Sequence, residues 1–433
     1  MQLRRELGVF GAIMMGLGSI IGTGVFVSIG IATGVAGPAV LLAILLAAAV
    51  ATCNGLSSAQ LAANHPVSGG TYEYGYRYLS PAMGFTAGWL FLCAKSASAA
   101  TAALGFSGYL LNTLSIREGV LVPVALGVTL GVALLVFFGL RRSNIANIII
   151  VTVTLATLFY FIIYGGTIGG GQAGVEALTP FFGEATDPVA KIRVTLEACA
   201  LMFVAYTGYG RIATMGEEVK SPRKTIPKAI ITTLWVSSLL YLCVGYVALT
   251  TLGPTAFAAA TAEQAAPLEV AARAFVFSDG AILLATGAMT AMLGVLLNLI
   301  LGLSRVMLAM GRRGDLPSIT ARIHEVRNTP TVAVLFVTLI ILIIIAQGDL
   351  RVAWSFSAFT VLLYYGITNL AALKLTKEER YYPRAISYAG LGACLFLAFW
   401  VEVRIWLFGL ALLGAGHLFR FLFARKKPDQ ELD

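Results

Sequence analysis

Two glycine-rich stretches inside apolar runs decide the fold: GLGSIIGTGVF at residues 16–26 and FVAYTGYGR at residues 203–211. Glycine tolerates the backbone angles that a helix break needs. Unwound backbone inside a bilayer survives only where protein buries it or where it lines a cavity. We therefore expect two interrupted helices, although glycines that only allow close helix packing would give a similar pattern.

The composition around these stretches is that of a membrane protein. Of the 433 residues, 58% are hydrophobic and only 12% are charged, and mean hydropathy is +0.86. Soluble domains carry about 25% charged residues, and the apolar runs here have the ~20-residue length that crosses a bilayer. The sequence predicts an all-α integral membrane protein with twelve transmembrane helices in a single domain, 1–433. The spans are expected at 8–32, 36–62, 82–113, 119–139, 144–166, 194–216, 228–252, 279–311, 330–346, 350–374, 385–401 and 403–423.

The charges indicate the orientation of these spans. The formal net charge is +9, but the basic residues sit in short loops between apolar runs, so a nucleic-acid partner is not expected. Most of the 30 Lys and Arg residues fall on the side that holds both termini, which the positive-inside rule makes cytoplasmic. We predict a multi-pass protein of the plasma membrane with a retained first helix and both termini in the cytoplasm.

The order of the two breaks predicts an inverted repeat. Five spans lead from the first break to the second, and an odd number of spans reverses the direction of the chain. The two halves are expected at 1–166 and 194–374, each opening with a broken helix, with two additional helices at 385–423. In such repeats the binding site lies between the halves near the bilayer midplane.

Four stretches carry a resemblance to a known family: GSIIGTGVF (18–26), PVSGGTYEYGYRYLSPAMGFTAGW (66–89), FVAYTGYGRIATMGEEVKSPRKTIPKAI (203–230) and SRVMLAMGRRGDLP (304–317). The sequence resembles the amino acid–polyamine–organocation (APC) superfamily, and within it the bacterial permeases related to cationic amino acid transporters. The matches span the first eight predicted helices. The resemblance implies the twelve-helix, five-plus-five inverted-repeat fold, alternating access and an amino acid substrate.

An amino acid zwitterion places two requirements on such a site. Its carboxylate needs N–H donors, which the restart of a broken helix supplies together with a positive dipole end. Its ammonium needs acceptors, and the first half of a broken helix ends in unpaired carbonyls. The resulting expected substrate-binding residues are Ile20, Gly22, Thr23, Gly24, Phe203, Val204, Ala205 and Thr207.

Aromatic residues of the second stretch are candidates for a gate. Phe203, Tyr206 and Tyr209 recur every three residues, and in the family an aromatic near this break closes over the substrate. Packing or interfacial aromatics are the alternative interpretation.

The resemblance also bears on substrate charge. Cationic-selective relatives tend to carry an acid at the second break and another on the third helix. The matching positions here are Gly210 and the run Cys93-Ala94-Lys95-Ser96. A lysine repels a cationic side chain, so a neutral amino acid is favoured, with cationic amino acids or polyamines as the alternative.

Three residues are candidates for ion coupling: Lys95, Thr154 and Arg211. Proton-coupled relatives carry a lysine where Thr154 stands here. Lys95 lies mid-span, where a charge is costly, so it is either a proton carrier or a structurally paired lysine. Arg211 either pairs with Glu217 or Glu218 or helps to hold a substrate carboxylate. Proton symport and exchange both stay open.

Other classes of function lack support. The sequence contains no GxxxxGK, HExxH or GxSxG motif, so neither an enzyme nor any catalytic residue or cofactor is expected. The five cysteines lie inside predicted spans without metal-ligand spacing, so no metal site is expected. No cysteine lies in a predicted external loop to bridge a heavy chain, and no obligate protein partner is implied. An amino acid sensor on the same fold is a further alternative, which the short predicted tails disfavour.

Overall fold

All regular secondary structure in the described part of the chain is helical. The computed structural model describes residues 7–67, 69–116, 119–139, 144–167, 173–214, 219–275, 280–324 and 329–423. Within these ranges the only β-type pairings are two isolated bridges, Leu7 with Val219 and His324 with Thr329. The longer elements are α1 (Val9–Ile20), α2 (Ile29–Ala36), α3 (Val40–Asn64), α4 (Thr71–Tyr78), α5 (Pro81–Thr113), α6 (Leu121–Phe137), α7 (Asn144–Thr167), α8 (Pro188–Tyr206), α10 (Pro222–Leu252), α11 (Pro254–Gln264), α12 (Pro267–Arg273), α13 (Gly280–Arg313), α14 (Thr331–Ile345), α15 (Leu350–Ala372), α16 (Arg384–Ala398) and α17 (Val403–Phe423).

The described helices include seven segments that are long and apolar enough to cross a membrane. Three shorter apolar helices, α6, α14 and α16, accompany them. The segment Val9–Asn64 counts as one because its helical turns follow each other without a loop, and it holds two of the predicted spans. The predicted all-α, multi-pass membrane fold is thus confirmed. The number of twelve spans and the inverted repeat stay predictions.

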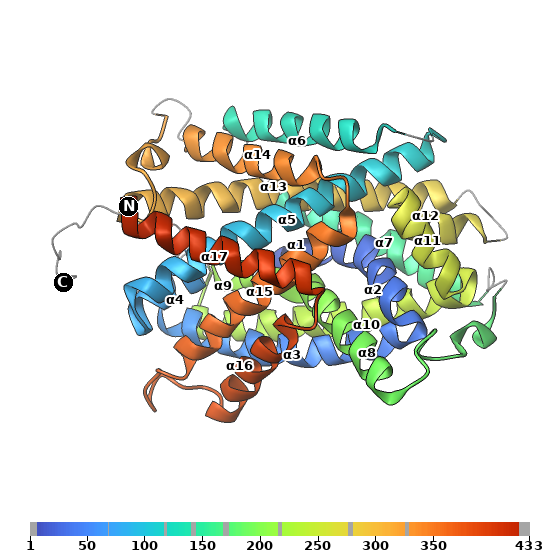
Figure 1. Cartoon of the computed structure of the whole chain (residues 1–433), viewed down its shortest axis with the longest axis horizontal. Coiled ribbons are helices and arrows are strands. Elements are labelled where there is room, and N and C mark those ends of the chain that lie inside the picture. The colour runs from blue at the N-terminus through green and yellow to red at the C-terminus, as the bar shows by residue number, and fades with distance from the viewer. Residues whose placement is uncertain are drawn as a thin grey trace.

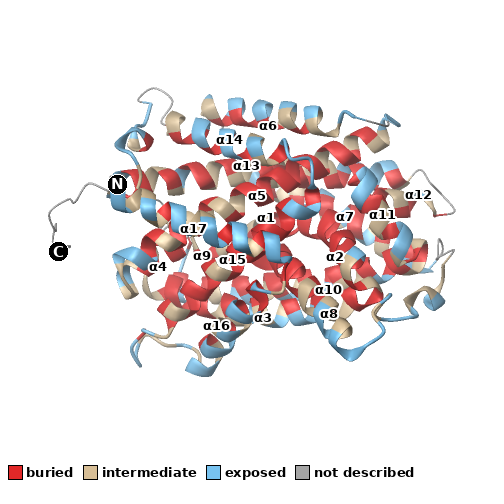
Figure 2. Ribbon diagram, in the orientation of Figure 1, coloured by how far each residue is buried: buried red, intermediate tan, exposed pale blue. Residues whose placement is uncertain are grey.

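Figure 1 shows α5 crossing the middle of the bundle, with α4 and α9 (Gly210–Ala213) at one end and α11 and α12 at the other. We call these the α4 end and the α12 end. The most apolar windows of α5 and α15 are 78% buried, whereas that of α17 is only 11% buried. Figure 2 shows the exposed outer faces of α6, α14 and α17 around this buried centre. The central helices are therefore the ones that position a site, and the outer ones present apolar faces suited to lipid.

The first glycine-rich stretch interrupts its helix. α1 ends at Ile20, and Ile21 adopts an extended conformation (φ −82°, ψ 97°). The Gly22 carbonyl then accepts hydrogen bonds from the amides of Val25 and Phe26, both at 3.1 Å, and the chain resumes as a π-helical turn at Gly24–Ser28. A single extended residue thus separates the two helical parts.

The second glycine-rich stretch interrupts its helix only partly, because the chain stays helical through it. α8 ends at Tyr206, and the chain passes through one 3₁₀ turn, Thr207–Tyr209, into the short α9. The flanking residues keep right-handed helical angles. The hydrogen-bond pattern changes here while the direction of the chain is nearly kept.

Two short helices occupy a region that the sequence analysis treats as a loop. α11 and α12 lie within 253–278, and each begins with a proline, Pro254 and Pro267. Proline suits the first turn of a helix because the amide it lacks has no partner there. Such short helices carry no long apolar run, so hydropathy does not reveal them.

Candidate functional site

The two interruptions lie against each other. A Cβ atom added to Gly208 would overlap the Ser19 carbonyl and lie 2.6 Å from the Ile20 amide nitrogen. A Cβ on Gly24 would lie 2.6 Å from the Tyr241 hydroxyl and 3.0 Å from the Ala205 Cβ. Glycine at these positions therefore lets the two chain segments approach backbone to backbone.

Tyr241 of α10 links the two interruptions. Its hydroxyl lies 2.9 Å from the Ile20 carbonyl and 3.1 Å from the Ala205 carbonyl, within donating distance of both. The side chain is fully buried and packs on the Tyr206 ring at 5.2 Å. The sequence does not predict this residue, because one tyrosine in an apolar helix gives no indication of its partners.

Side chains also satisfy the carbonyls around the second interruption. The Trp354 indole donates to the Leu201 carbonyl (2.9 Å), the Thr207 hydroxyl donates to the Val204 carbonyl (2.8 Å), and the Tyr365 hydroxyl donates to the Thr207 carbonyl (3.1 Å). Backbone groups at membrane depth need such partners. The interruption is thus held by α15 as well as by its own helix.

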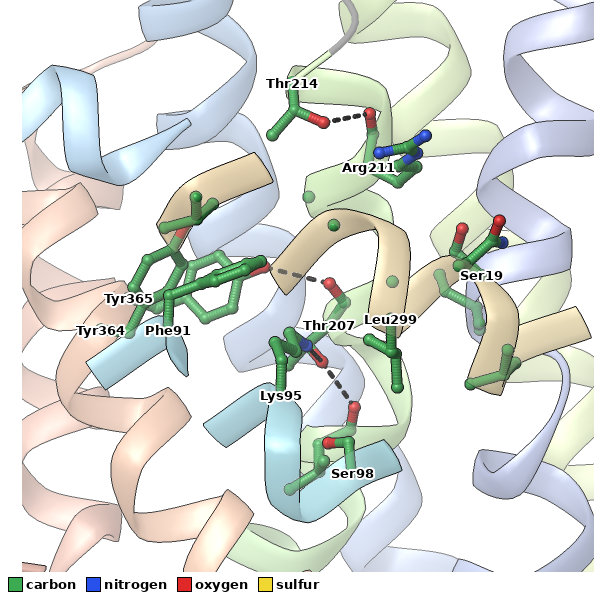
Figure 3. A pocket seen from close by; sticks show the side chains of 18 of the residues that line it. Ser19, Phe91, Lys95, Ser98, Thr207, Arg211, Thr214, Leu299, Tyr364 and Tyr365 are labelled. Carbon is green, nitrogen blue, oxygen red and sulfur yellow. Dashed lines mark hydrogen bonds between the residues drawn. The ribbon is translucent and has the colours of Figure 1, made fainter. Parts of the chain in front are cut away.

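A cavity of about 280 Å³ lies against both interruptions. This is near the lower end of the ~300–1,000 Å³ of small-molecule sites. Figure 3 shows Lys95 and Ser98 on one side of it and Arg211 and Thr214 farther along. Towards the α4 end it shares Arg305 and Ala309 with a second hollow between α4 and α13. The described lining residues are Ser19, Ile20, Thr23, Gly24, Gly69, Tyr72, Phe91, Lys95, Ser98, Val204, Ala205, Thr207, Gly208, Gly210, Arg211, Thr214, Val295, Asn298, Leu299, Gly302, Arg305, Val306, Ala309, Trp354, Tyr364 and Tyr365.

The cavity brings together most of the residues that the sequence analysis selects. The lining includes Ile20, Thr23, Gly24, Lys95, Val204, Ala205, Thr207 and Arg211. Gly22 is absent from the lining and packs against Val295, where an added Cβ would lie 2.6 Å from a methyl group. Thr154 also lies elsewhere, buried in α7 with its hydroxyl donating to the Ile150 carbonyl at 2.7 Å.

The three candidate gate aromatics are fully buried and are not among the described lining residues. Phe203 and Tyr209 pack on the Tyr365 ring at 5.8 and 5.3 Å, and the Tyr206 hydroxyl lies 3.3 Å from the Ile44 carbonyl. Their role as a gate stays a prediction. The aromatic residues that line the cavity are instead Tyr72, Phe91, Trp354, Tyr364 and Tyr365.

The charged groups of the cavity are basic. Lys95 is partly buried, and its ammonium donates to the Thr207 hydroxyl at 2.8 Å. Arg211 and Arg305 line the same space, and the described lining includes no Asp or Glu. The predicted partners of Arg211, Glu217 and Glu218, lie outside the described residues. The Thr23 hydroxyl is buried with no hydrogen-bond partner among the described groups.

Comparison with known proteins identifies the family of the chain. Residues 11–431 match the amino acid permease family. The chain belongs to the amino acid permease family. An uncharacterized transporter of Mycobacterium tuberculosis is 38% identical over 96% of this chain and 90% of its own length. The branched-chain amino acid permease BcaP of Bacillus subtilis is 28% identical over 98% and 94%. The mitochondrial cationic amino acid transporter 3 of Arabidopsis thaliana is 28% identical over 76% of this chain and 55% of its own length.

Membership of this family confirms the resemblance to the APC superfamily. The family and these relatives are transporters rather than enzymes, and an amino acid permease acts on amino acids. The relatives with named substrates divide between branched-chain and cationic amino acids. Family membership alone therefore does not give the charge of the substrate.

Proposed function

We propose that this amino acid permease is a secondary transporter that carries neutral amino acids across the plasma membrane by alternating access. The observation that carries the proposal is the cavity against the two interruptions, whose described charged lining residues are all basic. The charge distribution predicts cytoplasmic termini. On that prediction the α4 end lies on the inner side of the membrane, and so does the cavity that extends towards it.

The two interruptions offer complementary partners to a zwitterion. The carboxylate is expected at the restart of the first helix, near Thr23 and Gly24, where the dipole favours negative charge. The ammonium is expected at the carbonyls of Ile20 and Ala205. Both already lie near the Tyr241 hydroxyl, but a carbonyl oxygen has a second lone pair that can accept another hydrogen bond.

The preference for neutral over cationic substrates rests on the charge of the wall. A cationic side chain would enter a space lined by Lys95, Arg211 and Arg305 without a described carboxylate to pair with. Burying a charge without an opposite partner is costly. Cationic amino acids and polyamines are therefore the second candidates.

Counterflow in proteoliposomes tests the proposal. Vesicles holding the purified protein are preloaded with each common amino acid, agmatine or putrescine, and accumulation of external labelled leucine or alanine is measured. We expect stimulation by neutral amino acids and none by lysine, arginine or putrescine. Stimulation by the cationic compounds alone would contradict the substrate charge, and no stimulation by any amino acid would contradict transport.

The same vesicles distinguish exchange from proton symport. An imposed inward proton gradient drives uptake into empty vesicles only if protons are co-transported. Uptake that needs internal amino acid and ignores the gradient indicates an exchanger. Lys95 and Arg211 are the candidates for proton coupling that line the cavity.

A further inference from the structure

Lys95 is a cation in the cavity wall that lacks an anionic partner among the described residues. Among the described residues, its one hydrogen bond goes to the Thr207 hydroxyl at 2.8 Å. An ammonium has three N–H donors, so two remain for groups that enter the cavity. A partly buried ammonium whose described partner is a neutral hydroxyl has no opposite charge beside it, and a substrate can supply the missing acceptor.

The surroundings of Lys95 define what such a substrate must look like. Ser98 lies on the same face of α5, three residues along, and its hydroxyl is 2.8 Å from that of Ser357. Val295, Leu299 and Trp354 add apolar wall to the same cavity, and the indole N–H of Trp354 is already used by the Leu201 carbonyl. Figure 3 shows Leu299 beside Lys95 and Thr207. The space thus combines an apolar wall with a polar end that donates hydrogen bonds.

We propose that Lys95 selects amino acids whose side chain ends in a carbonyl oxygen, namely the amides and, with a full opposite charge, the corresponding carboxylates. This inference rests on the proposed transport function; it narrows the neutral substrates to the amides and adds the acidic amino acids. The methylene groups of glutamine or glutamate contact the apolar wall, and the terminal oxygen accepts hydrogen bonds from the Lys95 ammonium. The backbone ammonium and carboxylate stay at the two interruptions. Apolar side chains of the same length leave the ammonium of Lys95 without an acceptor.

Competition in the counterflow assay measures this preference. Glutamine, glutamate, methionine and norleucine have similar length and differ at the end of the side chain. We expect the two carbonyl-bearing compounds to inhibit uptake of the labelled amino acid at concentrations about tenfold or more below the other two, which is the effect of one hydrogen bond to a charged donor. Equal or stronger inhibition by methionine overturns the proposal on the wild-type protein alone.

Two variants assign the preference to one side chain. Lys95→Met removes the ammonium and keeps an unbranched chain, and it should abolish the preference, so that glutamine and methionine inhibit at similar concentrations. Lys228→Met makes the same substitution at an exposed position on α10 and should keep the preference. If Lys95→Met does not fold, the smaller change Lys95→Gln serves the same purpose.

The outcomes separate the two proposals. Uptake that responds to leucine or methionine but shows no preference for glutamine leaves the transporter in place and overturns the role of Lys95. A preference that persists in Lys95→Met also overturns it. Absence of counterflow with every amino acid overturns the proposed function, and it then overturns the proposed substrate class as well.

Discussion

At the scale of single residues, Gly208 decides how closely the two interruptions approach. An added Cβ would meet backbone atoms of Ser19 and Ile20, which cannot rotate away as a side chain can. We predict that Gly208→Ala separates the two segments, lowers counterflow at least tenfold and destabilises the fold by about 1–3 kcal/mol, as overpacking does. Counterflow and thermal unfolding in detergent measure the two effects.

Gly127→Ala is the matched control for this prediction. Gly127 also lies within a helix, α6, but nothing is within 4 Å of a Cβ placed there. Alanine has the higher helix propensity, so this variant should be neutral or slightly stabilised. Similar behaviour of the two variants would mean that the close approach at Gly208 has no role in the site.

Tyr241 makes a second prediction at this scale. Tyr241→Phe keeps the ring that packs on Tyr206 and removes the donor shared by the carbonyls of Ile20 and Ala205. Leaving a buried acceptor unpaired costs about 1–3 kcal/mol, so we expect a lower apparent unfolding temperature. Tyr246→Phe, at a position 43% exposed on the same helix, should leave it unchanged. An unchanged unfolding temperature for Tyr241→Phe would show that the carbonyls have other partners.

The sequence predicts residues of the site where the backbone itself forms it, and where a charged side chain such as Lys95 or Arg211 stands out in an apolar run. The glycines and Thr23 are recognisable because a helix break within an apolar run needs them. Tyr241, Trp354 and Tyr365 come from helices far along the chain; Trp354 and Tyr365 each donate to one carbonyl near the second interruption, and the Tyr241 hydroxyl is shared by two carbonyls. Nothing in the local pattern of those helices shows which carbonyl a side chain will reach, because the partner is set by tertiary packing.

At the scale of elements, a polar cluster fastens α17 to the α4 end. The Asp315 carboxylate follows α13 and is only 4% exposed. It accepts hydrogen bonds from the hydroxyls of Tyr72 (2.8 Å) and Tyr76 (2.6 Å), and it pairs with the Arg420 guanidinium at 3.2 Å. Burial and the neighbouring carboxylate raise the pKa of both tyrosines, so both hydroxyls stay protonated as donors. Three elements, α4, α13 and α17, thus meet at one carboxylate.

We predict that Asp315→Asn weakens this junction. The amide keeps the size but loses the charge that Arg420 pairs with, and it replaces one acceptor oxygen by a donor. Breaking a largely buried pair costs several kcal/mol when fully desolvated, and the 21% exposure of Arg420 lowers our expectation to about 2 kcal/mol. The apparent unfolding temperature should fall, whereas Glu263→Gln at an exposed position on α11 should not change it. An unaffected Asp315→Asn would show that α17 is held by apolar contacts alone.

Elements were predictable to the extent that hydropathy and length define them. The predicted span 82–113 corresponds closely to α5, because a proline starts it and an apolar run fills it. The predicted span 194–216 starts later than α8, whose capping Asp187 and early charged turn lie outside the apolar run. The extent to which the second helix is interrupted was not predictable. A glycine permits a break, but hydrogen bonds from Thr207 and α15 determine the form that the break takes.

At the scale of the whole molecule, the charge of the loops predicts to which side of the membrane the cavity opens. The basic loops predict cytoplasmic termini, and the cavity extends towards the α4 end, where Arg305 and Arg312 lie. We predict from this orientation that the structure represents a state open to the inside. The α12 end then faces outward, and α11 and α12 lie over the outer side of the bundle.

Cysteine labelling tests this orientation in a variant that lacks the five native cysteines. Gly302 lines the cavity, and a Cβ there meets nothing within 4 Å, so Gly302→Cys fits without displacing a neighbour. A membrane-impermeant maleimide should label it in inside-out vesicles and not in intact cells, and bound substrate should slow the labelling because the residue lies in the same cavity. Glu263→Cys, exposed on α11 at the α12 end, should show the opposite sidedness without protection by substrate. Labelling of both positions from the same side would contradict the arrangement of the two ends across the membrane. Labelling of Gly302→Cys only from outside would reverse the orientation that the basic loops predict.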